Sequence, residues 1–181
     1  VSALLGHTLA IDSAPGQGTR VRIALAASEP ALADTVAPQP ADTLDGAVVA
    51  VIDDSAEVRA ALQLLLEQWN AQVVQAASSA DVARSLAEGA FGPGGMPDLL
   101  VVDHDMGDET GFDAIERLRA RTGWEQMPAV MVTGSVSPDI EQRSRALGVP
   151  LVLKPARPAQ MRRVLHALLS RRREAADAMA A

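Results

Sequence analysis

An unbroken apolar run that ends at a carboxylate constrains the fold of this chain more than any other feature. Residues 99–102 are all Leu or Val, and Asp103 follows them directly. A run of this length without polar alternation is typical of a strand that is buried on both faces, as in a parallel sheet. The next residues are rich in acids and glycine, so the chain leaves the core at Asp103. In open α/β sheets, ligands bind at the carboxyl ends of the parallel strands, and Asp103 is expected at such an end.

The chain after residue 46 alternates such strand-like runs with amphipathic helical patterns. Strands are expected at residues 47–52, 72–75, 99–103, 129–133 and 151–153. Helices with apolar positions at i, i+3 and i+4 are expected near residues 58–69, 78–86, 112–118, 137–147 and from 158 onward. Five strands alternating with five helices predict an α/β fold with a doubly wound parallel sheet and helices on both faces. The right-handedness of crossover connections favours the flavodoxin-like strand order 2-1-3-4-5.

The first 45 residues follow a different pattern. Residues 8–12 and 20–25 alternate apolar and polar positions on either side of a turn-rich segment, which predicts a β-hairpin. Residues 27–45 are rich in Ala, Pro, Asp and Thr without periodicity, so we expect a linker there. The α/β domain is then expected over residues 46–173, followed by a short tail over residues 174–181.

Composition narrows the classes of function that the chain can have. Its 181 residues suffice for one domain with appendages, and its formal net charge of −7 argues against binding nucleic acid through a broad basic face. The sequence contains no Cys, no visible signal peptide and no apolar run of about 20 residues that could span a bilayer. These features favour a cytoplasmic protein without direct membrane contact. Because the first residue is Val1, the chain is expected to be part of a longer protein.

The ends of the predicted strands carry polar side chains that should meet at one edge of the sheet. These are Asp53, Asp54, Asp103, Thr133 and Lys154. Three carboxylates about 4 Å apart would repel each other by roughly 4 kcal/mol per pair at an effective dielectric constant near 20, so a cation is needed. Oxygen ligands in a loop suit Mg²⁺. Lys154 is the single lysine among sixteen basic residues, which indicates that a compact ammonium is required at this place.

These residues as a set resemble the receiver domain of two-component response regulators, over residues 47 to about 170. The matching positions are Asp53 and Asp54 for the acidic pair, Asp103 for the phosphoacceptor, Gly111 for the loop glycine, Thr133 for the switch residue, and Lys154 before Pro155 for the lysine that precedes a cis proline. Two positions depart from the family. Gly107 stands where a proline is usual, and Leu151 stands at the aromatic switch position.

The resemblance implies a phosphorelay function. Asp103 would take a phosphoryl group from a phosphohistidine, carried by a kinase dimerisation domain or a histidine phosphotransfer protein. The implied cofactor is Mg²⁺, with Asp54 and Asp103 as ligands, Asp53 acting through water, and the backbone carbonyl of Asp105 completing the set. Thr133 and Lys154 would hold the phosphoryl oxygens. The chain would thus be a phosphoacceptor that catalyses its own phosphorylation and dephosphorylation.

Residues 1–26 resemble the last two strands of the ATP-binding domain of histidine kinases. The similarity lies in Leu4-Leu5-Gly6 and in Pro15-Gly16-Gln17-Gly18-Thr19. The nucleotide-binding boxes of that family are missing, so this piece is not expected to bind ATP. A kinase terminus followed by a receiver implies the C-terminal receiver of a hybrid histidine kinase, whose parent chain is a transferase and could be membrane-anchored. A stand-alone response regulator is the alternative.

An enzyme with an aspartate nucleophile is a further alternative. Asp103-His104-Asp105 matches the Asp-x-Asp motif of haloacid-dehalogenase-type phosphatases, which also use Mg²⁺. In that family the acidic pair follows the lysine, whereas here it precedes every other motif. A dinucleotide-binding module would need Gly-x-Gly-x-x-Gly after the first strand, where Asp53-Asp54-Ser55 stands instead.

Overall fold

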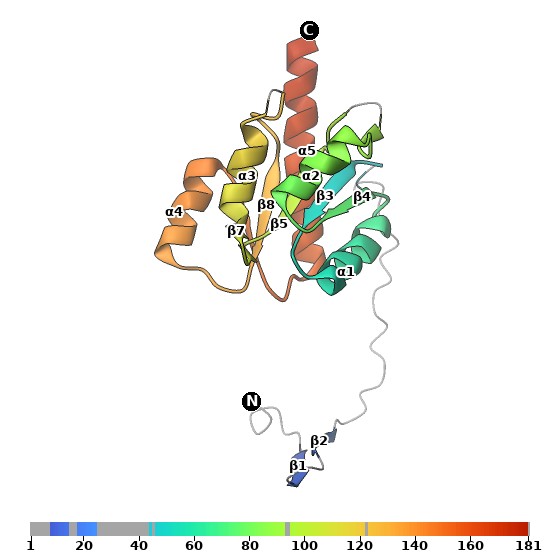
Figure 1. The fold of residues 1–181 in the computed structure, drawn as a ribbon, viewed down its shortest axis with the longest axis vertical. Coiled ribbons are helices and arrows are strands. Elements are labelled where there is room, and N and C mark those ends of the chain that lie inside the picture. Colours follow the sequence, from blue (N-terminus) through green and yellow to red (C-terminus); the bar gives the residue numbers. More distant parts are fainter. Residues whose placement is uncertain are drawn as a thin grey trace. The chain divides into compact units, whose positions relative to one another are not determined.

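The structure is a computed structural model that describes residues 8–14, 18–24, 44, 46–92, 95–121 and 123–180. They form two units, a β-hairpin and an α/β unit (Figure 1). The hairpin pairs β1 (Thr8–Ala14) with β2 (Gly18–Ala24) in antiparallel orientation, with Leu9 opposite Ile23. The predicted hairpin is therefore confirmed. The Leu4-Leu5-Gly6 motif, residues 15–17 and most of the predicted linker lie outside the described residues.

The α/β unit is built on a five-stranded parallel sheet. Its strands are β3 (Val48–Ile52), β4 (Gln72–Ala76), β5 (Leu99–Asp103), β8 (Ala129–Thr133) and β9 (Leu151–Leu153). They lie in the order β4-β3-β5-β8-β9, with every neighbouring pair parallel. Numbered among themselves, these strands have the predicted order 2-1-3-4-5.

Side chains of β5 point alternately to the two faces of the sheet, so this one strand contributes to both hydrophobic cores. Leu99 and Val101 belong to the core on one face of the sheet, and Leu100 and Val102 belong to the core on the other. All four side chains are at most 1% exposed. Burying each of them contributes roughly 1.5–3 kcal/mol. The apolar run has no polar position because neither face of this strand meets water.

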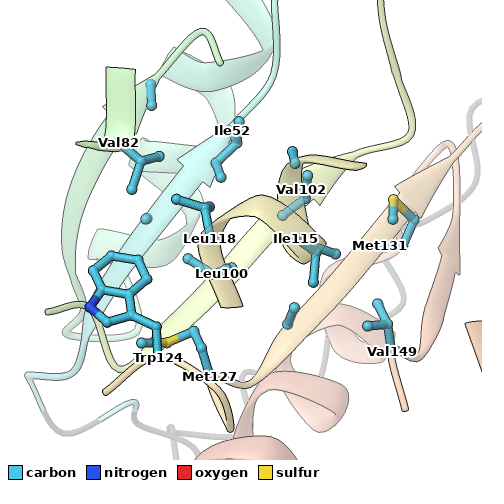
Figure 2. Close-up of a cluster of buried hydrophobic side chains, with 14 of the residues drawn as sticks. Ile52, Val82, Leu100, Val102, Ile115, Leu118, Trp124, Met127, Met131 and Val149 are labelled. Carbon is cyan, nitrogen blue, oxygen red and sulfur yellow. The ribbon is translucent and has the colours of Figure 1, made fainter. Parts of the chain in front are cut away.

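Helices cover both faces of the sheet. They are α1 (Ala56–Glu67), α2 (Ser79–Ala87), α3 (Gly111–Arg119), α4 (Pro138–Leu147) and α5 (Pro158–Ala180). Leu66 of α1 and Met161 of α5 pack in one core. Figure 2 shows the other core, where Val82 of α2 meets Ile115 and Leu118 of α3 over the sheet. The flavodoxin-like fold that the sequence predicts is thus confirmed. Among the described residues, no helix combines the length and the apolar character needed to cross a membrane.

Hydroxyl side chains begin the first four helices. Ser55, Ser78, Thr110 and Ser137 each accept a hydrogen bond from the backbone N–H three residues later. Each cap therefore fixes where its strand-to-helix connection turns into the helix. Two of these four connections, those before α1 and α4, directly follow a strand whose end carries a predicted site residue.

Both ends of the α/β unit differ from the domain boundaries expected. Leu44, which falls in the predicted linker, is 1% exposed in the core that also contains Leu66 of α1 and Met161 of α5. Its amide donates to the carbonyl of Trp69 at 2.7 Å, which ties this residue to the end of α1. The predicted tail from residue 174 is helical up to Ala180, because it is rich in alanine, the residue with the highest helix propensity. Figure 1 shows the last turns of α5 projecting beyond the sheet.

A small hairpin replaces the loop expected after Asp103. Its strands are β6 (Asp105–Met106) and β7 (Glu109–Thr110), joined by a turn at Gly107 and Asp108. Gly107 has φ of 69°, which glycine adopts without steric cost and which suits the first position of a tight hairpin turn. Proline is fixed near −65° and cannot adopt this conformation. The turn therefore explains why glycine stands here in place of proline.

Candidate functional site

The carboxyl ends of β3 and β5 bring three carboxylates together. Asp53, Asp54 and Asp103 each present an oxygen, and these oxygens lie within 4.8 Å of one another. The cluster forms because β3 and β5 are neighbours in the sheet and end at the same level. Asp53 and Asp103 are 2% and 6% exposed, whereas Asp54 is exposed. The cluster therefore has a buried floor and one side open to solvent.

Lys154 reaches this cluster from the end of β9. Its Nζ lies 2.7 Å from Oδ1 of Asp103 and 3.7 Å from Oδ2 of Asp53. Burial opposes the ammonium charge, but the hydrogen bond to Asp103 and the two carboxylate charges outweigh it and raise the pKa of Lys154. The predicted meeting of Lys154 with the acidic residues is confirmed. One ammonium still leaves the three carboxylates with excess negative charge.

Asp53 shows most clearly that Lys154 alone does not satisfy the cluster. Its Oδ1 accepts a hydrogen bond from the amide of Ser55 at 2.9 Å, but its buried Oδ2 has no hydrogen-bond partner among the described residues. Burial, reinforced by the charges of Asp103 and Asp54, raises the pKa of the Asp53 carboxyl despite the Ser55 amide and Lys154. A set of oxygen donors with one unsatisfied buried oxygen fits a hard divalent cation such as Mg²⁺.

Arg59 supports the acidic pair and was not predicted from the sequence. Its Nη1 donates to the backbone carbonyls of Asp53 at 2.7 Å and Asp54 at 3.1 Å. The guanidinium therefore fixes the backbone that carries two of the three carboxylates. The available signal was an arginine near the start of the helix that directly follows the acidic pair.

Thr133 lies at the predicted edge, but its hydroxyl is bound within its own loop. The side chain is fully buried, and Oγ1 donates to the carbonyl of Ser135 at 2.8 Å while accepting from the Ser135 amide at 3.3 Å. Its single proton is therefore directed at the β8–α4 connection and not at Asp103.

Asp105 is not one of the three clustered carboxylates. Its side chain is 79% exposed and lies 2.8 Å from Nδ1 of His104. The resemblance assigned only the backbone carbonyl of Asp105 to the metal, so the position of this carboxylate does not conflict with it. The ring of His104 also packs edge-on against Phe112 with a centroid distance of 5.6 Å.

Gly111 lets α3 begin directly against the backbone of Asp103. A Cβ at this position would lie 2.2 Å from the carbonyl oxygen of Asp103 and 2.6 Å from Sδ of Met131. The amide of Gly111 also donates to the carbonyl of His104 at 2.9 Å. The absence of a side chain is therefore a packing requirement of the connection that holds Asp103.

A family model identifies the family to which this chain is similar. A family model described as the response regulator receiver domain matches residues 49–166. An uncharacterized 14.6 kDa protein from Leptolyngbya boryana is 31% identical over 118 residues, which cover 65% of this chain and 86% of that protein. The family model thus agrees with the resemblance to receiver domains found in the sequence.

Solved structures show the same fold. The chemotaxis protein CheY4 of Vibrio cholerae is 25% identical with a TM-score of 0.58, over 67% of this chain and 98% of that one. A receiver domain protein from Clostridium thermocellum is 22% identical with a TM-score of 0.61, over 70% and 97%. The receiver domain of a signal transduction histidine kinase from Syntrophus aciditrophicus is 21% identical with a TM-score of 0.58, over 68% and 90%. Because the matched segment contains Asp53, Asp54, Asp103 and Lys154 in one assembled cluster, this chain belongs to the response regulator receiver domain family of two-component signalling.

Proposed function

We propose that the chain accepts a phosphoryl group on Asp103 from a phosphohistidine, with Mg²⁺ as cofactor, as the receiver of a phosphorelay. The observation that carries this proposal is the ammonium of Lys154, 2.7 Å from the Asp103 carboxylate, beside the unsatisfied buried oxygen of Asp53. A nucleophilic carboxylate flanked by one fixed cation and further cation-binding oxygens is what phosphoryl transfer requires, because that reaction depends on positioning and charge neutralisation.

The residues of the cluster have distinct parts in this reaction. An oxygen of Asp103 attacks phosphorus, and the new P–O bond forms as the P–N bond breaks and its electron pair leaves with the imidazole. Lys154 holds one phosphoryl oxygen. Thr133 holds another, which requires its hydroxyl to exchange its hydrogen bond to Ser135 for one to the phosphoryl group.

The solvent-facing side of the cluster is where Mg²⁺ would bind. Asp54, Asp103 and the backbone carbonyl of Asp105 would hold Mg²⁺ directly, and Asp53 would do so through water. When bound, the cation supplies charge neutralisation at the transferring phosphoryl oxygens.

Labelling with a small phosphodonor tests the proposal. With Mg²⁺ and either acetyl phosphate or phosphoramidate, the chain should gain one phosphoryl group by mass spectrometry. Asp103→Asn should abolish this gain, whereas the matched control Asp108→Asn, in the exposed turn of the β6–β7 hairpin, should be labelled normally. A label that survives Asp103→Asn would place the acceptor elsewhere and reject the proposal.

We also propose that this receiver belongs to a hybrid histidine kinase in the cytoplasm. The support is the β1–β2 hairpin, whose two antiparallel strands correspond to the pair expected at the end of a kinase ATP-binding domain. The reading frame upstream of Val1 should then encode nucleotide-binding boxes and a phosphoacceptor histidine. A reading frame without them would favour the stand-alone regulator.

A further inference from the structure

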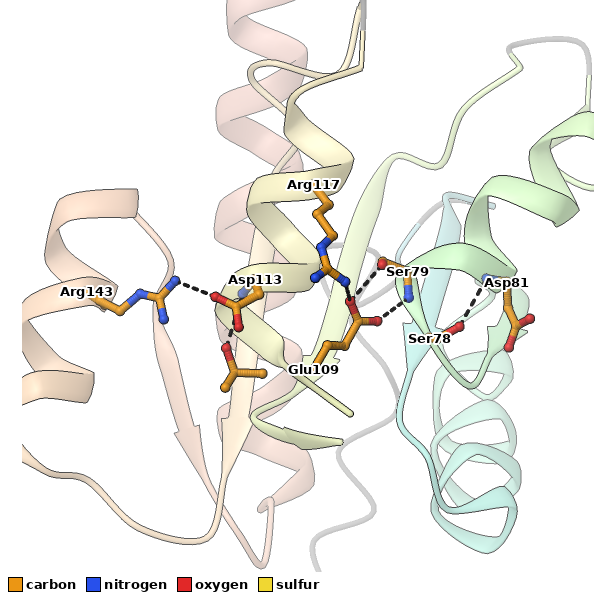
Figure 3. A network of polar contacts seen from close by, with 8 residues as sticks. Ser78, Ser79, Asp81, Glu109, Asp113, Arg117 and Arg143 are labelled. Carbon is orange, nitrogen blue, oxygen red and sulfur yellow. Dashed lines mark hydrogen bonds and ion pairs between the residues drawn. The ribbon is translucent and has the colours of Figure 1, made fainter. Parts of the chain in front are cut away.

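The side chain of Glu109 joins the hairpin that follows Asp103 to two helices. Its carboxylate accepts hydrogen bonds from the backbone amide of Ser79 at 2.6 Å and from the Ser79 hydroxyl at 2.8 Å, at the start of α2. It also pairs with Nη1 of Arg117 on α3 at 2.7 Å. Figure 3 shows the carboxylate lying between the two helices. Three donors from two helices therefore converge on one side chain of β7.

This contact is stronger than an ordinary surface ion pair. The Glu109 side chain is only 7% exposed, and a carboxylate at a helix N-terminus interacts favourably with the free amides and the helix dipole. Ser78 already caps α2 by accepting from the amide of Asp81 at 3.2 Å, so the amide of Ser79 is left for Glu109. The hairpin and α2 are thus held together by a buried, charge-assisted connection.

The hairpin needs such a connection because its own pairing is short. Each strand has two residues, and an isolated two-stranded ladder of this size is marginal in water. Met106 anchors one strand in the core at 5% exposure, and Glu109 anchors the other. The two anchors come from residues that face each other in the ladder.

The hairpin also borders the acidic cluster. A Cβ on Gly107 would lie 3.9 Å from Oδ2 of Asp54, so the turn of the hairpin passes close to that carboxylate. A cleft of about 500 Å³ between the hairpin and the start of α2 has Asp54, Gly107 and Glu109 among its lining residues. Ser79 and Glu109 both line this cleft, so their contact lies beside the acidic cluster.

We propose that Glu109 is a positioning residue for the Mg²⁺ site. By fastening the hairpin to α2 and α3, it holds the backbone of Asp105 and the turn at Gly107 against the acidic cluster. This inference rests on the proposed function, because the carbonyl of Asp105 is a proposed ligand of Mg²⁺. Glu109 acts through the hairpin backbone and does not itself bind the metal.

The test compares Glu109→Gln with a matched control in the full chain. Glu116 of α3 also pairs with an arginine, Arg143 of α4, and lies outside the hairpin. Glu116→Gln therefore removes the same charge from an ion pair that does not hold the hairpin. Mg²⁺ alone is titrated while the amide shifts of Asp54 and Gly107 are followed. Glu109→Gln should weaken Mg²⁺ binding about tenfold and speed amide exchange across the hairpin, because residues that orient metal ligands have effects of this size. Glu116→Gln should leave both measurements unchanged.

Labelling by acetyl phosphate separates positioning from a merely structural role. In Glu109→Gln the Mg²⁺ concentration for half-maximal labelling should rise about tenfold, while the rate at saturating Mg²⁺ stays within about twofold of wild type. A residue that only stabilised the fold would lower the melting temperature without moving the Mg²⁺ dependence. If Glu109→Gln does not fold, Ser79→Ala removes one of the three donors and should weaken Mg²⁺ binding in the same direction.

The outcomes distinguish this inference from the proposed function. Mg²⁺ binding and hairpin exchange in Glu109→Gln that equal those of Glu116→Gln would overturn the positioning role, even if Asp103 is labelled normally. A wild-type chain that binds Mg²⁺ but is never labelled would overturn the proposed function, and the titration would still decide the role of Glu109.

Discussion

Replacing Asp53 by Asn should make the metal-free protein more stable at neutral pH. Asp53 is 2% exposed, one of its oxygens has no hydrogen-bond partner among the described residues, and burial raises the pKa of its carboxyl. The folded chain therefore keeps an ionised carboxylate in an unfavourable place. Asparagine removes the charge and keeps an Oδ1 that can accept from the Ser55 amide.

The size of this effect follows from the distances in the cluster. Carboxylate oxygens within 4.8 Å repel by at least about 3.5 kcal/mol per pair at an effective dielectric constant of 20, and Asp53 takes part in two such pairs. Its attraction to Lys154 across 3.7 Å offsets about 4.5 kcal/mol of this repulsion. The exposed Asp54 is screened more strongly, so the net gain should be about 2 kcal/mol, which raises the melting temperature by roughly 4–8 °C.

Thermal unfolding in EDTA, as a function of pH, measures the prediction. The folded-state pKa of Asp53 is raised, so the contribution of this group to stability is complete below its unfolded value near 3.8 and is lost as pH rises through the raised pKa. The advantage of Asp53→Asn should therefore be largest at neutral pH and should shrink as pH falls through the raised pKa. Added Mg²⁺ should stabilise the wild type more than the variant.

A control variant removes an acidic charge away from the cluster. Asp139→Asn removes an exposed acid from the first turn of α4 and should give no increase in stability. An Asp53→Asn variant that melts at or below the wild-type temperature in EDTA at pH 7 would refute the electrostatic reasoning.

Three further substitutions test the surroundings of the cluster. Gly111→Ala should destabilise the fold by about 2–4 kcal/mol, because its Cβ would meet a backbone carbonyl at 2.2 Å and the sulfur of Met131 at 2.6 Å. Chemical denaturation measures this change, and an unchanged free energy of unfolding would contradict the packing argument. Lys154→Arg should fold normally yet lose most acetyl phosphate labelling, because a longer planar fork cannot replace a compact ammonium 2.7 Å from its partner; normal labelling with wild-type amide shifts would remove the lysine from the mechanism. Separate substitutions of Asp105 and of Ser135 should each alter the lifetime of the phosphorylated form without altering the fold. An unchanged rate of dephosphorylation in both variants would contradict a role of these two side chains in that lifetime.

The parallel sheet and the acidic cluster could be predicted because they depend on strand order and strand ends. The apolar run before Asp103 marks a strand buried on both faces, and an acidic pair ends the strand that becomes its neighbour. Once the order was predicted, Asp53 and Asp103 had to meet, and Lys154 had to approach from the same edge. This part of the site is a consequence of topology, which hydrophobic patterning encodes directly.

The contacts around the cluster could not be predicted in the same way. The β6–β7 hairpin has two residues per strand, too few to show alternation, and its one sequence signal is the Gly107-Asp108 turn. The bond from Glu109 to Ser79 joins residues 30 positions apart and depends on how α2 is placed over the sheet. The orientation of the Thr133 hydroxyl is a rotamer choice that its loop decides.

Because Lys154 is the single lysine in this sequence, it is the one side-chain amine that an amine-selective reagent can modify. Acylating reagents such as activated esters attack only unprotonated amines, and apart from the amino terminus this chain offers them one lysine and no cysteine thiol. That lysine is held by a hydrogen bond to the phosphoacceptor and has a raised pKa, so its acylation is slow while Asp103 carries its charge. The rate at which the adduct on Lys154 itself appears, located by peptide mapping in a mass spectrometer, therefore reports the charge of the phosphoacceptor, with no tag or engineered residue.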